Sequence, residues 1–265
     1  MLKNEYPNLL IENRDNGVLL ITLNRPHVSN AFDTQTGIDL KNCFMALGEQ
    51  SREYRSVVLT GAGDKAFCAG GDLKERNSLN DEQWLLQHEI FERAFKAVLD
   101  CPIPVIAAVN GAAYAGGLEI MLQCDFAYAS TTARFALTEV SLGIMPGGGG
   151  TQLLPRIIGE RRAKELILAA KPFSAEEAHA WGLVNKLCKP EDLMTETLAV
   201  AERIAANAPI SVRTAKHSIH HGLQMDLASG MLFEIEAYQR MVGTQDRKEG
   251  IRSFNEKRKP KFIGK

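Results

Sequence analysis

The sequence predicts an α/β fold, on three observations. Short runs of β-branched and apolar residues recur through the first two thirds of the chain, each bounded by Gly, Pro, Asn or Asp, as buried strands are. Segments with helical periodicity lie between these runs, an alternation typical of repeated strand and helix units. From about Asp192 onward only helical patterns follow. We therefore expect an α/β unit with a C-terminal helical segment.

The expected elements follow this division along the chain. Strands are predicted at residues 18–23, 57–60, 105–109, 126–129 and 184–187. Helices between them are predicted at residues 31–49, 81–99, 118–124 and 161–169. Amphipathic C-terminal helices are predicted at residues 193–207, 209–221, 225–241 and 246–257. We divide the chain into a core of residues 1–200 and a helical segment of residues 201–265 that serves assembly or covers the site.

Composition limits the function classes. The 265 residues are enough for one large core, and 31 basic residues nearly cancel 32 acidic ones, which removes a global electrostatic reason to bind nucleic acid or an anionic membrane. The five cysteines are odd in number and show no C-x-x-C spacing, so we expect reduced thiols. No apolar stretch approaches eighteen uncharged residues and no secretory leader is visible. We expect a soluble, cytoplasmic protein.

Two glutamates stand in otherwise apolar stretches beside glycine turns: Glu119 in N-G-A-A-Y-A-G-G-L-E-I-M-L and Glu139 in F-A-L-T-E-V-S-L-G-I-M-P-G-G-G-G. Because burying an isolated carboxylate costs several kcal/mol, this context favours a partner or a reaction that requires it. The pair predicts acid/base chemistry. The alternatives are a first-turn helix residue stabilised by the helix dipole for Glu119, and a surface residue at an edge strand or helix entry for Glu139.

Two glycine turns could supply backbone donors. Gly70-Gly71 precedes a predicted helix start at Asp72, and Gly116-Gly117 opens the helix that carries Glu119. Glycine lets an N–H group face a cavity with no Cβ in the way, and a helix start adds partial positive charge. Two such donors make a minimal oxyanion hole, in which each is typically worth about 3 kcal/mol. The alternative for the first turn is a plain helix N-terminus capped by Asp72.

Other patterns are weaker. The glycines at 147–150 have no G-K-[ST] after them, so a nucleotide loop is not expected. His217 and His221 have the i,i+4 spacing of zinc ligands but no third ligand, so we predict no metal site. Cys68 is interpreted as a small packing residue because no base lies near it in sequence.

Five motifs are distributed along the chain: L-N-R-P-x-x-x-N-A at 23–31, A-F-C-A-G-G-D at 66–72, P-V-I-A-A-V-N-G at 104–111, A-G-G-L-E at 115–119 and T-E-V-S-L-G-I-M-P-G-G-G-G-T-Q at 138–152. With this set of motifs the chain resembles the enoyl-CoA hydratase/isomerase, or crotonase, superfamily over nearly its whole length. The resemblance implies a spiral of ββα units, a homotrimer or dimer of trimers, and a coenzyme A thioester substrate. No further cofactor is implied, because coenzyme A is part of the substrate.

The resemblance also implies roles for single residues. Gly71 and Gly116 are similar to the residues whose N–H groups hold the thioester oxygen, and Glu119 and Glu139 to the two carboxylates of a hydratase. Relatives that only shift a double bond often keep the carboxylate that matches Glu139, so an isomerase is the alternative. Ala115 departs from the family, in which many relatives have a third glycine. The residues implied to contact substrate or coenzyme A are Arg25, His27, Val28, Ala66, Cys68, Ala69, Gly70, Asp72, Leu73, Tyr114 and Lys257.

Three questions stay open at the level of sequence. The motifs D-L-K-E-R at 72–76 and P-G-G-G-G-T-Q-L-L-P-R at 146–156 look most like the methylglutaconyl-CoA hydratase branch, whose distal carboxylate would need a cation such as Lys74 or Arg76. Short-chain and aromatic-pathway enoyl-CoAs are the alternatives.

A relative in that branch binds RNA, so RNA binding is an alternative of another class. Here the helix at 31–49 has one lysine, Lys41, and the tail at 257–265 is the candidate basic patch. A purely structural member of the family is disfavoured by the retained glutamates and glycine turns.

Overall fold

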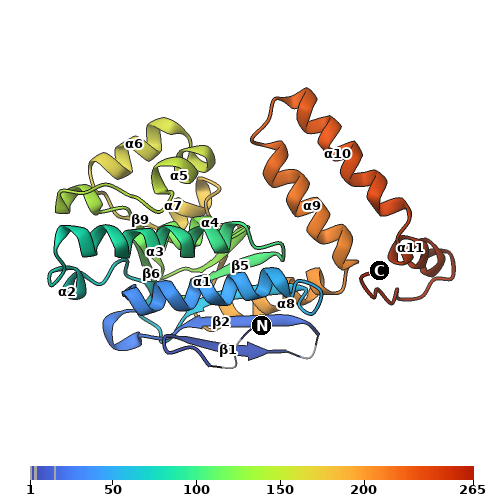
Figure 1. Cartoon of the computed structure of the whole chain (residues 1–265), viewed down its shortest axis with the longest axis horizontal. Helices are drawn as coiled ribbons and strands as arrows, with labels where there is room; N and C mark the ends of the chain where they lie inside the picture. The colour runs from blue at the N-terminus through green and yellow to red at the C-terminus, as the bar shows by residue number, and fades with distance from the viewer. Residues whose placement is uncertain (1, 3–4, 15) are drawn as a thin grey trace.

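A six-stranded sheet forms the centre of the computed structural model, which describes residues 2, 5–14 and 16–265 (Figure 1). Its strands, in spatial order, are β1 (Leu9–Asn13), β2 (Val18–Leu23), β3 (Ser56–Gly61), β5 (Val105–Val109), β7 (Phe126–Ser130) and β10 (Lys186–Cys188). β1 pairs with β2 in antiparallel fashion and the other neighbours are parallel. The predicted α/β class is confirmed.

The central strands β3 and β5 of this sheet are buried on both faces. In β3, Val57 and Leu59 belong to the large core, whereas Val58 belongs to a smaller cluster beneath α8 (Leu193–Ala205). Successive side chains of a strand point to opposite faces, so this alternation shows that both faces are covered. That is why these strands read as continuous apolar runs.

A second sheet of four short strands was not predicted from the sequence. In spatial order it contains β4 (Ala66–Cys68), β6 (Ala112–Tyr114), β8 (Arg134–Ala136) and β9 (Phe173–Ser174). β4, β6 and β8 each follow closely on a strand of the large sheet, namely β3, β5 and β7. Because β4 and β6 are parallel neighbours, the two glycine turns that follow them lie at the same edge.

Helices connect these strand pairs. In chain order the helices of the first two thirds are α1 (Thr34–Glu49), α2 (Leu73–Arg76), α3 (Asp81–Leu99), α4 (Gly116–Gln123), α5 (Gly150–Ile158), α6 (Glu160–Leu168) and α7 (Ala175–Ala180), with 3₁₀ helices η1 (Pro26–Val28) and η2 (Glu139–Leu142). The helix predicted from residue 31 begins at Thr34, because the Asp33 side chain caps it by accepting from the Thr36 amide. The start of α2 was predicted at Asp72, whereas the short helices α5 and α7 were not predicted.

The C-terminal segment is helical, as predicted, with α8, α9 (Pro209–Gly222), α10 (Leu227–Val242) and α11 (Gln245–Asn255). α8 packs on the large sheet, so the predicted division at residue 200 falls inside it. α9 and α10 form a hairpin that projects away from the sheets (Figure 1). Within the described part of the chain, no helix is both long and apolar enough to cross a lipid bilayer. All five cysteines are free.

Candidate active site

A cavity of about 390 Å³ lies between α2, α3, α4 and the segment around η2. Most of its wall is apolar, and the ionisable residues in its lining are Arg76, His88, Glu119 and Glu139. Four residues singled out from the sequence for catalysis, Gly71, Gly116, Glu119 and Glu139, all line it. The fold therefore brings together groups that are up to 68 positions apart, from residue 71 to residue 139.

The two glycine turns touch each other at one end of this cavity. A Cβ added to Gly70 would lie 2.8 Å from the Cβ of Ala115, and one added to Gly116 would lie 4.0 Å from the amide nitrogen of Gly71. Gly70 also has φ +95°, a left-handed conformation that favours glycine. A Cβ at Gly117 would lie 2.0 Å from the carbonyl oxygen of Cys68, so glycine there lets α4 approach β4.

The amides of Gly71 and Gly116 have no backbone acceptor among the described residues. On either side of Gly71, the Phe32 N–H donates to the Gly70 carbonyl at 2.7 Å and the Asp72 N–H donates to the Phe32 carbonyl at 2.9 Å. Gly116 is the first residue of α4, where an N–H group has no acceptor within the helix. Two unpaired amides at the cavity therefore form a pair of donors that can hold an oxyanion.

Ala115 adopts φ 49° and ψ −125° at the N-cap of α4. An L-residue with a Cβ is strained in this region, at a cost of about 1 kcal/mol or more, whereas glycine is not. Alanine at position 115, where many relatives have glycine, therefore places a methyl group in the cavity lining at the expense of local backbone strain.

Glu119 is buried in the wall of the cavity, with 3% of its surface exposed. Its Oε1 accepts hydrogen bonds from the Gly148 amide at 2.7 Å and the Gly150 amide at 2.9 Å. Burial raises the pKa of this carboxyl, while the two amides and the nearby Arg76 guanidinium offset part of the rise. The glycine run at 147–150 thus orients Glu119.

Glu139, the first residue of η2, is also buried, but neither carboxyl oxygen has a hydrogen-bond partner in the described structure. Burial, together with the charge of Glu119, raises the pKa of Glu139 to about 7. The two glutamates therefore occupy different environments: Glu119 is held as an acceptor, and Glu139 retains a proton closer to neutral pH.

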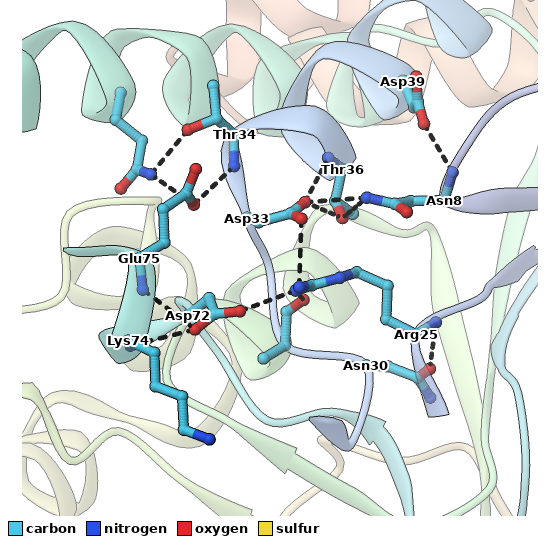
Figure 2. Close-up of polar contacts among 12 residues, drawn as sticks. Asn8, Arg25, Asn30, Asp33, Thr34, Thr36, Asp39, Asp72, Lys74 and Glu75 are labelled. Carbon is cyan, nitrogen blue, oxygen red and sulfur yellow. Dashed lines mark hydrogen bonds and ion pairs between the residues drawn. The ribbon is translucent and has the colours of Figure 1, made fainter. Parts of the chain in front are cut away.

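Arg25 is engaged away from the cavity lining (Figure 2). Its Nη1 donates to the Ala31 carbonyl at 2.6 Å and to Asp72 Oδ2 at 3.0 Å, and its Nη2 lies 3.2 Å from Asp33 Oδ2. Asp72 also caps α2, by accepting from the amides of Lys74 and Glu75, as predicted. Arg25 thus joins the starts of α1 and α2, and with them the turn that carries Gly71.

The remaining predicted contact residues are distributed unevenly. Ala69 and Leu73 line the cavity, whereas Ala66, Cys68 and Gly70 are buried just behind it. Burial raises the pKa of the Cys68 thiol to about 12, which fits a packing residue.

The other contact residues predicted from the family pattern lie further from the cavity lining. His27 is exposed and Val28 half-buried on η1, Tyr114 is half-buried at the end of β6, and Lys257 is exposed after α11. Their contacts with coenzyme A stay predictions.

Sequence reasoning missed the wall contributed by α3. Trp84, Leu85, His88, Phe91 and Phe95 all line the cavity from this helix. The spacing of 84, 88, 91 and 95 is a helical stripe, a signal that was present in the sequence but is equally typical of core packing. Arg76, considered there only as a possible cation, lines the cavity, whereas Lys74 is exposed.

No cluster of three or more His, Cys, Asp or Glu residues suited to a metal ion occurs in the part of the chain that the structure describes. His217 and His221 pack ring to ring on α9, with centroids 4.2 Å apart, next to Phe233. They lie on the projecting hairpin and do not line the cavity.

Comparisons with known proteins agree with this fold. The family described as Enoyl-CoA hydratase/isomerase matches residues 13–265. The chain is 44% identical to YngF of Bacillus subtilis, over 97% of this chain and 98% of that protein. It is 40% identical to the short-chain-enoyl-CoA hydratase of Clostridium acetobutylicum, over 96% and 97% of the two chains.

A crystal structure of an enoyl-CoA hydratase from Bacillus anthracis has a TM-score of 0.95 to this chain, at 43% identity, and covers 97% of this chain and 100% of that one. The spiral arrangement of strand pairs and helices predicted from the resemblance is confirmed.

Proposed function

Because the chain belongs to the enoyl-CoA hydratase/isomerase family, we propose that it adds water across the 2,3 double bond of a short-chain 2-enoyl-CoA thioester. It is a hydro-lyase, and its substrate is an acyl-CoA thioester. The observation that carries the proposal is the meeting of two buried carboxyl groups and two unpaired backbone amides in one cavity. A double-bond isomerase needs fewer of these groups, so the pair of glutamates favours hydration.

The two amides act on the thioester oxygen. When water adds at C3, negative charge moves onto that oxygen as an enolate-like transition state forms. The N–H groups of Gly71 and Gly116, the latter at the positive end of α4, stabilise the charge where it develops. Each such donor is typically worth about 3 kcal/mol of transition-state stabilisation.

The two glutamates divide the proton transfers. Glu119, oriented by the Gly148 and Gly150 amides, accepts the proton of the attacking water. Glu139, whose pKa is raised to about 7 so that a large fraction of it carries a proton at neutral pH, delivers a proton to C2. The water oxygen is then bonded to C3, a proton to C2, and the thioester carbonyl is restored.

Coenzyme A is expected to enter past the η1 loop and β4. Arg25 organises the turn behind Gly71, and His27, Val28 and Ala69 remain candidates for contacts with adenosine and pantetheine. Lys257 remains a candidate for a phosphate contact, from its own or a neighbouring subunit. No additional cofactor is part of the proposal, and we place the enzyme in the cytoplasm.

The assembly we propose is a homotrimer or a dimer of trimers. A groove of about 880 Å³ with a largely apolar lining runs between α9, α10 and α11. Large apolar side chains are exposed along the hairpin, and Leu223 and Leu227 are each 79% exposed. Apolar surface of this extent is typical of an interface between subunits.

A panel of thioesters tests the function. The purified chain is mixed with crotonyl-CoA, methylglutaconyl-CoA and a 3-enoyl-CoA, and the absorbance of the conjugated thioester is followed. Hydration predicts loss of this absorbance with the first two substrates. A gain of absorbance with the 3-enoyl-CoA and silence with the others would identify an isomerase, and silence with all three would reject both activities.

A further inference from the structure

Arg76 presents a guanidinium to the cavity from the end of α2. The group lies over the ring of Trp84, at 4.4 Å from the ring centroid, and at 5.4 Å from that of Phe91. Its Nε donates to Gln87 Oε1 at 3.0 Å. The plane of the guanidinium is therefore held by two aromatic rings and one hydrogen bond.

The side chain that accepts from Arg76 Nε is itself buried. Gln87, 3% exposed, donates from Nε2 to Thr34 Oγ1 at 2.8 Å and to Glu75 Oε2 at 2.9 Å. Glu75 Oε2 also accepts from the Thr34 amide at 2.9 Å, as Figure 2 shows. Every polar atom of the Gln87 amide group has a partner, so the orientation of the guanidinium is set before any ligand arrives.

The two terminal nitrogens of Arg76, Nη1 and Nη2, are available to a ligand. Within residues 2, 5–14 and 16–265, neither Nη1 nor Nη2 has a hydrogen-bond or salt-bridge partner, and neither is sealed from the cavity. Glu75, and after it Glu119 and Glu139, act on its charge through space, but none of these described carboxylates forms an ion pair with it. Burial lowers the pKa of the Arg76 guanidinium, because the charged form is costly to bury in this largely apolar wall.

Apart from Glu75, Glu119 and Glu139, no acidic side chain of the described residues lines the cavity around Arg76. Leu73, Leu85, Leu142, Ile144 and Met145 complete this part of the lining, and His88 pairs with Glu92 at 3.1 Å. A charge placed among apolar side chains is costly unless an opposite charge meets it. A planar guanidinium with two free NH₂ groups matches a carboxylate, which it can bind with two parallel hydrogen bonds.

We propose that Arg76 binds a carboxylate at the end of the acyl group, so that the preferred substrates are short 2-enoyl-CoA thioesters of dicarboxylic acids. This inference rests on the proposed function. A Cβ at Gly71 would lie 3.4 Å from Arg76 Cζ, which places the guanidinium close to the thioester site. This closeness limits the acyl group between the two sites to a short chain.

Binding tests the inference without turnover. We would measure the dissociation constants of glutaryl-CoA and of its terminal amide, which are saturated and cannot be hydrated, by calorimetry. The wild type is expected to bind glutaryl-CoA at least about tenfold more tightly. Arg76→Met should abolish the difference, Arg76→Lys should keep part of it, and Lys74→Met, a neighbouring exposed cation of α2, should keep all of it.

Each other result overturns the inference. Equal affinities in the wild type would show that no carboxylate is recognised, and discrimination that persists in Arg76→Met would assign it to another residue. If Arg76→Met weakens both ligands alike, the guanidinium acts on the thioester or the glutamates. If Arg76→Met does not fold, the inference is decided by two other results: the difference between the two dissociation constants in the wild type, and the reduction of that difference in Arg76→Lys.

Kinetics separates this inference from the proposed function. Hydration of glutaconyl-CoA and crotonyl-CoA is compared by kcat/KM, and Arg76→Met should lower the first at least about tenfold more than the second. Equal hydration of both by the wild type would leave the hydratase standing and reject the role of Arg76. Silence on both substrates, with tight binding of glutaryl-CoA, would reject the hydratase and leave the carboxylate site.

Discussion

α3 and α10 are both long amphipathic helices, of 19 and 16 residues, yet the fold uses them in opposite ways. α3 packs between α1 and α4 and buries Gln87, Phe91 and Phe95 while lining the cavity. The structure describes every residue of α10 and buries none of them. An amphipathic pattern therefore identifies a face that needs covering, but not what covers it.

The connections of the two regions differ in the same way. The region around the cavity is held by a continuous apolar core and by buried polar networks such as the one at Arg25. The hairpin of α9 and α10 meets the core through a few polar ties: Lys216 Nζ donates to Asp125 Oδ2 at 2.7 Å and to the Ile103 carbonyl, and Arg213 donates to the Ser51 carbonyl. The first region is held by contacts within one chain, and the second is where we propose that another copy binds.

The largest expected effect lies in the cavity region. Glu119→Gln and Glu139→Gln should each lower kcat about 10² to 10⁴-fold, because each removes a positioned proton transfer, while the fold persists. Hydration of crotonyl-CoA and the circular dichroism of each variant are the measurements. Glu89→Gln, an exposed carboxylate on α3, is the control and should leave kcat unchanged. Near wild-type turnover in either cavity variant would remove that residue from the mechanism.

The next effect concerns assembly through the hairpin of α9 and α10. Met231→Asp combined with Tyr238→Asp places two charges on exposed apolar positions of α10 that line the groove. Burying these charges between subunits is costly, so the mass in analytical ultracentrifugation should fall from that of a trimer or hexamer to that of one chain. Gln239→Asp, at an exposed polar position of the same helix, should keep the assembly. A wild-type protein that sediments as a single chain would contradict the assembly itself.

A smaller effect is expected within the core of the first region. Arg25→Met leaves Asp33 and Asp72, whose side chains are 19% and 13% exposed, without their cation. Loss of one partner of a largely buried pair should lower the free energy of unfolding by about 2 kcal/mol in urea titrations. Lys164→Met, which removes the exposed ion pair with Glu160 on α6, should leave it unchanged. Equal stability of Arg25→Met and wild type would show that the network does not hold these helices.

The smallest effect concerns the pH dependence of stability. The pKa of Glu139 is raised from 4.5 to about 7 in the folded protein. Below about pH 4.5 the carboxyl is neutral in both states, and its contribution to the free energy of unfolding is then fully present. This contribution is lost as the pH rises through about 7, because the folded state must then bury a charge. Glu139→Gln should thus gain about 1 to 2 kcal/mol over the wild type between pH 5 and pH 8 in urea unfolding. A difference that does not change with pH would place the carboxyl in water.

The local signals of the sequence determined most of the framework. Residues 18–23, 81–99 and 105–109 were predicted with the bounds that the structure has, because an apolar run or a long helical stripe is set by its own residues. The three-residue strands β4 and β6 escaped prediction, since so short a segment is stabilised by pairing with its neighbour rather than by its own composition. The glycine turns and the two glutamates were recognised by their improbable setting in apolar surroundings.

Tertiary structure alone decided how these groups meet and differ. Parallel pairing of β4 with β6 brings Gly71 beside Gly116. The amides of Gly148 and Gly150 make Glu119 an acceptor, while Glu139 has no hydrogen-bond partner among the described residues. It also turned Arg25 inward and Arg76 toward the cavity. The sequence by itself determined which residues are present and which segments they build. Distances, burial and hydrogen-bond partners depend on contacts between distant segments, so only the folded chain assigns them.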